Sequence, residues 1–453
     1  MSGNLPKELN LASNKPMSAN GKPYINRFRA DNSSYSGGDV IRIEIPCGRQ
    51  GTYLFPKDSF IEAKVQLTVV DSGTSQKYFI DQSVYSLFNR IRVYHGSNII
   101  EDTLYTNRLW TALYDLQVNE VERRGDCITK LVNDTTDTTN KYPIFQDGCN
   151  GQQIVTSSGT ASTSTTSSLY DFAFVIPSAV LGSLCSKALP LGLMGSASIY
   201  LELELANANV AFVSNSSTNT SISYIVQDIY YNAKMTTLPS DINDALIEST
   251  GGFINVPAIA YKSEVKSMAS GISAFNDKFS YQFSSLKNFL FFFINTSTAT
   301  GAVTKRSVTA RPRANLSDFF LLINGEAFPS QTVANPSRMY AELLRAFDSL
   351  TDTNAGGILS YQNYTNSNTH TTADDVLNAT VTNTTQKRFF AGVDLDKFNH
   401  SSDTLMSGTS SIGQMVNIQL NFSSALTEAL NLYSAVQYDV LYHIEGGLIS
   451  PKF

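Results

Sequence analysis

The sequence predicts an all-β protein made of two tandem eight-stranded jelly rolls, with one short helix in each. Three observations lead to this fold class. Many short segments alternate apolar and polar residues, a helical segment occurs in each half, and the order of these features repeats after about half of the 453 residues. An alternating strand has one face for a second sheet to bury, which favours two packed sheets over a helical bundle.

The clearest repeat joins an apolar strand to a helix. Residues 90–96 end in Gly, and a polar linker of about ten residues leads to a helix over residues 107–116 that begins at Asn. Residues 319–325 also end in Gly, and a similar linker leads to a helix over residues 335–350 that begins at Asn. Asn is a residue that caps helices. The Gly residues stand 229 positions apart and the Asn residues 228, so we expect one domain fold used twice rather than a solenoid.

The composition fits this organisation and restricts function. A chain of this length suits two domains, and 11% aromatic with only 16% charged residues favours β-structure over disorder. The net charge of −6 disfavours nucleic-acid binding by the folded body. The first 38 residues are the exception, with five basic and two acidic residues. We favour a solvated arm there, with weak genome contact as the open alternative.

The cysteines and the N-terminus indicate synthesis and folding inside a cell. The four cysteines have no metal-ligand or redox spacing, and they are Cys47, Cys127, Cys149 and Cys185. Free thiols in a reducing compartment are therefore expected. Residues 1–30 lack the apolar core of a signal peptide, and no apolar run is long enough to span a membrane.

The first half is expected to follow its arm with a series of strands. Period-two alternation or apolar runs predict strands at 40–45, 60–69, 172–177, 199–205 and 223–231. A Thr/Ser/Asn-rich tract at 133–168 is predicted to be an elaborate surface loop. The predicted divisions are an N-terminal arm at 1–38, a first jelly roll at 39–237, a linker at 238–252 and a second jelly roll at 253–453.

The second half repeats that order. Strands are expected at 253–256, 261–268, 286–294, 388–395, 416–422 and 436–443. A second Asn/Thr-rich tract at 351–386 stands about 220 positions after the first. Several features thus recur in one order at similar spacing, which is better explained by duplication than by chance.

No constellation of residues predicts catalysis, a cofactor or a metal. The four histidines are far apart in sequence, which argues against a cupin metal site; they are His95, His370, His400 and His443. Glu202 and Glu204 lie on one face of a predicted strand, but the matching positions of the second half are amides, so a solvated or subunit-facing surface is favoured over glycoside chemistry. Trp110 is expected to pack in the core. Asn-x-Ser/Thr triplets, as at Asn215, Asn219, Asn378 and Asn383, follow from composition.

Short motifs give the chain a resemblance to a known family. They are residues 43–48, Tyr53-Leu54 with the strand that follows Pro56, and residues 188–193 before the strand at 199. With the tandem order of strands, these motifs resemble double-jelly-roll major capsid proteins of double-stranded DNA viruses, in particular those of virophages and polinton-like viruses.

The resemblance implies a structural protein of the virion. It implies homotrimers of pseudo-hexagonal outline that tile an icosahedral shell, assembled inside the host cell, with neighbouring capsomers, penton proteins and minor or cement proteins as partners. Residues 133–168 and 351–386 would then be outer crowns, and 1–38 an inner arm. The alternative is a tandem β-sandwich lectin or adhesin that binds glycans through its long loops.

Overall fold

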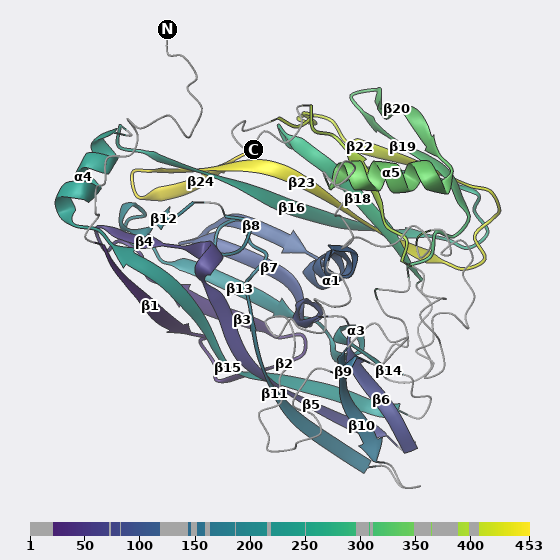
Figure 1. Cartoon of the computed structure of the whole chain (residues 1–453), viewed down its shortest axis with the longest axis horizontal. Helices are drawn as coiled ribbons and strands as arrows, with labels where there is room; N and C mark the ends of the chain where they lie inside the picture. Colours follow the sequence, from purple (N-terminus) through teal and green to yellow (C-terminus); the bar gives the residue numbers. More distant parts are fainter. Residues whose placement is uncertain are drawn as a thin grey trace, which may run out of the picture.

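The chain forms two β-sandwiches, one from each half (Figure 1). This computed structural model describes residues 21–71, 74–81, 83–117, 144–145, 152–158, 164–185, 187–214, 219–249, 251–295, 308, 311–347, 364, 388–397 and 407–453. Helix α4 (Ser240–Ser249) lies between the last strand of the first half and the first strand of the second. The all-β double jelly roll predicted from the sequence is confirmed.

The first sandwich contains a seven-stranded sheet and a four-stranded sheet. The first has the order β11-β5-β15-β4-β12, with β1 and β2 also paired to β15, and the second has the order β3-β13-β7-β8. Their bounds are β1 Lys22–Arg29, β2 Ser34–Ser36, β3 Val40–Ile45, β4 Thr52–Leu54, β5 Phe60–Asp71, β7 Phe88–His95, β8 Asn98–Leu104, β11 Ser164–Phe174, β12 Leu189–Pro190, β13 Ile199–Leu205 and β15 Asn219–Thr237. A further sheet, β14-β6-β10-β9, consists of β6 Thr74–Ile80, β9 Ile144–Phe145, β10 Gln152–Ser158 and β14 Phe212–Ser214.

The second sandwich has sheets of five and four strands. The five-stranded sheet has the order β16-β23-β18-β21 with β24 on β23, and the four-stranded sheet has the order β17-β22-β19-β20. Their bounds are β16 Ile254–Met268, β17 Ala274–Phe279, β18 Leu286–Asn295, β19 Leu316–Ile323, β20 Glu326–Ala334, β21 Ala391–Asp394, β22 Val416–Phe422, β23 Leu430–Glu445 and β24 Leu448–Lys452. The stretches predicted at 253–256 and 261–268 thus belong to one long strand.

The strands form where side chains alternate, because one face of each enters the core. Ile41, Ile43 and Ile45 of β3 are fully buried, whereas the residues between them are exposed. β5 and β13 show the same alternation along their whole lengths. β18 differs, because nine of its ten residues are buried and the tenth is half-buried, which fits a strand covered on both faces.

The strand-to-helix repeat is confirmed, with two corrections. The expected polar linkers are strands, since β8 and β20 form hairpins with β7 and β19. Helix α1 spans Thr106–Gln117 and α5 spans Pro336–Ala346, so the helices start 230 positions apart. Asn335 caps α5 by accepting a hydrogen bond from the Arg338 backbone N–H at 3.0 Å. Asn107, in contrast, lies inside the first turn of α1, and the residue before that helix is Tyr105.

Two other sequence predictions were wrong in part. The 133–168 tract contains β9, β10 and the start of β11, because a backbone ladder forms without alternating apolar side chains. Its other residues, and 351–386 apart from Tyr364, lie outside the described residues. In the expected arm at 1–38, residues 22–36 include β1 and β2, which pair with β15 and so belong to a sheet. The helical pattern expected from Asp241 to Glu248 in the linker is α4, and the four-residue α3 (Ala208–Ala211) adds to the one helix expected per half.

Candidate functional site: the joint between the two sandwiches

Helix α1 lies between the two sandwiches (Figure 1). Leu109, Leu113 and Leu116 are buried along the helix, as the apolar spacing predicted. Aromatic side chains just before and within the helix meet the second sandwich. The Tyr105 ring lies 5.9 Å from that of Tyr433, edge to face, and the Trp110 ring lies 5.2 Å from that of Tyr261. Such pairs stabilise a contact beyond the area they bury.

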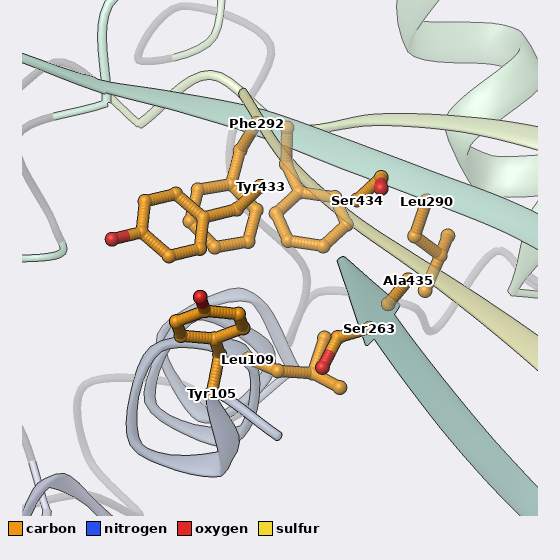
Figure 2. Close-up of a pocket in the computed structure, with 9 residues that line it drawn as sticks. Tyr105, Leu109, Ser263, Leu290, Phe292, Tyr433, Ser434 and Ala435 are labelled. Carbon is orange, nitrogen blue, oxygen red and sulfur yellow. The ribbon is translucent and has the colours of Figure 1, made fainter. Parts of the chain in front are cut away.

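Figure 2 shows the contact at the start of α1. Tyr105 and Leu109 approach Phe292, Tyr433 and other side chains of the five-stranded sheet. The cavity left between them measures about 10 Å³, which holds one water molecule at most. The apolar contact is therefore closely packed, as in a protein interior.

A buried ion pair crosses the joint beside this cavity. Arg311 precedes β19 and is fully buried, and its Nη2 lies 2.8 Å from Oδ2 of Asp115 on α1. The guanidinium also donates to the carbonyl oxygens of Phe389 and Val308 at 3.0 and 2.9 Å. Arg388 lies 3.7 Å from the other oxygen of Asp115. A buried carboxylate that is paired and hydrogen-bonded in this way fixes the relative position of two elements.

A second carboxylate of the first sandwich also reaches across. Asp81 is fully buried, and it accepts a hydrogen bond from the Val308 backbone N–H at 3.0 Å. Its Oδ2 also lies 3.2 Å from Nη1 of Arg108, on α1. Asp81 therefore binds both α1, through Arg108, and the backbone of Val308 in the second half.

Strands β8 and β16 are also tied together along the joint. Thr103 Oγ1 donates to the carbonyl oxygen of Tyr261 at 3.1 Å, and Ser263 Oγ donates to that of Leu104. A separate antiparallel bridge joins Cys185 of the first half to Ala258 of β16. The joint therefore combines apolar contacts, buried charges and backbone pairing, which favours one fixed arrangement of the two sandwiches.

Glu101 is a buried acid at the edge of this joint. Its carboxylate accepts hydrogen bonds from Ser178 Oγ and from the Ala179 backbone N–H, the latter at 2.9 Å. Burial raises the pKa of Glu101 to about 7, although these hydrogen bonds oppose the shift. Ser178 Oγ in turn accepts from the Leu181 backbone N–H at 3.0 Å. Glu101 thus organises the loop that leads to Cys185.

The polar residues weighed from the sequence do not form a common site. Glu202 pairs with Arg92 at 3.1 Å, and Glu204 accepts from Asn89 at 2.8 Å. His95 is buried, with Nε2 2.9 Å from the Met194 carbonyl oxygen.

His443 and Asn219, which were also weighed from the sequence, lie apart from these residues and from each other. His443 lies 2.8 Å from Asn255 Oδ1, and Asn219 starts β15. His370, His400, Asn215, Asn378 and Asn383 lie outside the described residues. Within the described ranges, no three His, Cys, Asp or Glu side chains gather to hold a metal.

Of the four cysteines, the structure describes two. Cys47 and Cys185 are free thiols, and burial raises the pKa of each to about 11. Cys127 and Cys149 lie outside the described residues. In the part of the chain that the structure describes, no helix is long and apolar enough to cross a membrane.

The buried charges of the joint, Asp81, Asp115 and Arg311, were not predicted from the sequence. Asp115 lies next to Leu116 in the sequence but outside the apolar face formed by Leu109, Leu113 and Leu116, so the helical period gave no signal for it. Its partner lies 196 positions later, and sequence spacing carries no information on such a distant contact.

Comparison with solved structures assigns the fold to a class. No family model matches the sequence, and none of the curated proteins searched is similar to it. A chain of the Sputnik virophage, solved by cryo-EM, is similar with a TM-score of 0.56 and 12% identity, over 99% of this chain and 92% of that one. The Faustovirus major capsid protein has a TM-score of 0.54 and 11% identity, over 98% and 93%. The mavirus major capsid protein has a TM-score of 0.52 and 9% identity, over 99% and 95%.

The chain is therefore a double jelly roll, and the resemblance inferred from the sequence is confirmed at the level of the fold. Its solved neighbours include major capsid proteins of a virophage and of Faustovirus, and the likeness runs through both sandwiches. These neighbours give no support to the glycan-binding alternative.

Proposed function

We propose that this protein is a major capsid protein that self-associates into homotrimers, which tile an icosahedral viral shell. The observation that carries the proposal is the pair of like sandwiches held in one fixed arrangement by the buried joint around Asp115 and Arg311. Two sandwiches per chain and three chains per ring give six similar lateral faces, and a hexagonal outline tiles a surface. The solved neighbours named as major capsid proteins support the same role.

The proposed role is structural rather than enzymatic, and its place is the virion. The partners are other copies of this chain, first within the trimer and then in neighbouring capsomers. Penton proteins and minor or cement proteins would complete the shell, and residues of the N-terminal arm would face its interior. The proposed domains are a first jelly roll that takes in β1 and β2 and ends at residue 237, a linker at 238–252 that includes α4, and a second jelly roll at 253–453.

The proposal is tested by measuring the mass of the purified full-length chain in solution. Size-exclusion chromatography with light scattering should give three times the 49.6 kDa of one chain. A protein that remains a monomer up to high concentration would overturn the proposed function. A stable dimer would also overturn it, because two chains cannot give the six lateral faces.

A further inference from the structure

Each sandwich has an equivalent sheet, centred on β15 in the first and on β23 in the second, but the outer faces of these two sheets have different surroundings. In the first sandwich β5 and β11 lie on one side of β15, with β1 and β2 on the other. In the second, β18 and β21 lie on one side of β23, with β16 on the other. The sheet around β23 faces the first sandwich and is covered there by α1, whereas the sheet around β15 lies on the far side of the first sandwich (Figure 1).

The outer face of the β15 sheet carries a polar groove. The groove measures about 220 Å³, and its lining residues are Arg27, Glu62, Ala63, Lys64, Asp171, Asp228 and Tyr230. Among the described residues, no helix covers this face. Apolar residues extend it, because Leu169 and Ile225 both pair with Gln66 and are each 39% exposed. The groove thus occupies the position that α1 covers on the equivalent sheet.

The second half carries the counterpart of α1. With the 230-residue offset between the helices, Tyr105 corresponds to Asn335, and Asp115 to Arg345. Met339 and Leu343 of α5 are fully buried, and their counterparts Leu109 and Leu113 are buried in α1. Arg345 projects outward, with its side chain 47% exposed.

The charges of the groove and of α5 are complementary. The groove contains three carboxylates and two basic side chains, which leaves an excess of one negative charge. Helix α5 contains Arg338 and Arg345 against Glu342, which leaves an excess of one positive charge. At the joint within the chain the corresponding surfaces are largely apolar and aromatic. The two contacts would therefore share geometry but differ in chemistry.

We propose that the groove on the β15 sheet binds α5 of a second copy of this chain, as the β23 sheet binds α1 within the chain. This inference rests on the proposed function, and it identifies the surfaces through which the trimer forms. The contact is head to tail, because the groove of one copy meets the helix of the next. Such contacts close into a ring when the rotation between copies is suitable, and six like sandwiches then surround one axis.

The contact between copies should be sensitive to salt because it is polar, whereas the joint within the chain should not be. Exposed charges are screened by salt, with a Debye length of about 3 Å at 1 M ionic strength. The trimer should therefore dissociate in high salt into folded monomers, while the buried pair of Asp115 and Arg311 keeps each monomer intact.

Two variants on the opposite sides of the contact test the proposal. Leu169→Arg places a cation in the groove face, and the double variant Arg338→Glu/Arg345→Glu reverses the charge of α5. Each should raise the apparent dissociation constant of the trimer at least tenfold in light scattering. Arg338→Lys/Arg345→Lys keeps the charge and should still form trimers. Ile412→Arg, at a 62% exposed position outside the groove, is the matched control for Leu169→Arg and should leave the trimer unchanged.

A mixing experiment shows whether the contact is head to tail. Each defective variant keeps one good surface, so an equal mixture of the groove and α5 variants should form dimers that do not close into rings. Circular dichroism of each variant checks that the monomer is folded. If the wild-type chain forms trimers and both variants form them equally well, the assigned surfaces are wrong while the proposed function stands. If the wild-type chain does not self-associate, the proposed function fails as well.

Discussion

Replacing Arg311 by Met should separate the energetics of the joint from those of the two sandwiches. The substitution leaves Asp115 buried, with Nε of Arg388 3.7 Å from its Oδ1. It also removes the donors to the carbonyl oxygens of Val308 and Phe389. Loss of one partner of a buried pair costs about 3–5 kcal/mol, because the other charge remains desolvated. We therefore expect the free energy of unfolding to fall by about 3 kcal/mol or more.

The assay can report on the joint itself, because Trp110 is the only tryptophan. Its ring lies 5.2 Å from that of Tyr261 across the joint, so its fluorescence should follow separation of the sandwiches in urea. Far-UV circular dichroism follows the strands in the same samples. In Arg311→Met the fluorescence transition should move to lower urea than the circular dichroism transition, because the joint opens first.

A matched double variant decides whether the missing charge is the cause. Arg311→Met with Asp115→Leu removes the buried carboxylate together with its guanidinium partner, and an apolar replacement of a buried pair is often neutral. It should recover most of the stability that the single variant loses. The reasoning is refuted if the single variant unfolds within about 1 kcal/mol of the wild type. It is also refuted if the double variant is as unstable as the single one.

Three further predictions concern single residues. Burial raises the pKa of Glu101, so this residue keeps its proton up to a pH of about 7 in the folded chain, whereas the unfolded chain releases it near the ordinary pKa of 4.5. The protonated side chain therefore contributes its full stability below pH 4.5, and the free energy of unfolding falls by about 3 kcal/mol as the pH rises to 7. Urea unfolding of Glu101→Gln should show no such fall. A Cβ on Gly182 would stand 1.7 Å from the Ile176 carbonyl oxygen, so Gly182→Ala should lower the thermal midpoint by several degrees, a loss of about 3 kcal/mol. Asn335→Ala removes the cap of α5 at a φ of 64° and should cost about 1–2 kcal/mol in urea unfolding, while Asn335→Gly should cost less.

The parts of the fold that the sequence predicted are those in which side-chain period reports burial. Strands such as β3, β13 and β22 have one buried face and one face turned toward solvent, so period-two alternation located them closely. β10 has few apolar residues, and its pairing with β6 through the backbone left no such pattern. β1 is largely exposed and holds its place through pairing with β15, so its composition was mistaken for that of an arm.

The joint could not be predicted from the sequence for a different reason. Asp81 and Val308 are 227 positions apart, and their contact exists only once both halves have folded and met. Period and capping signals describe a single element and its immediate neighbours. The helix α1 was therefore predictable as an amphipathic element, but its role between the sandwiches depended on the tertiary structure.

Cryo-EM of the purified full-length protein tests the central claim most directly, because it shows both the number of chains and the arrangement of their sandwiches. The account predicts a ring of three chains with six sandwiches around one axis, and α5 of each copy against the β15 sheet of the next. Particles that contain one chain, or copies joined with α1 rather than α5 at their contact, would contradict it.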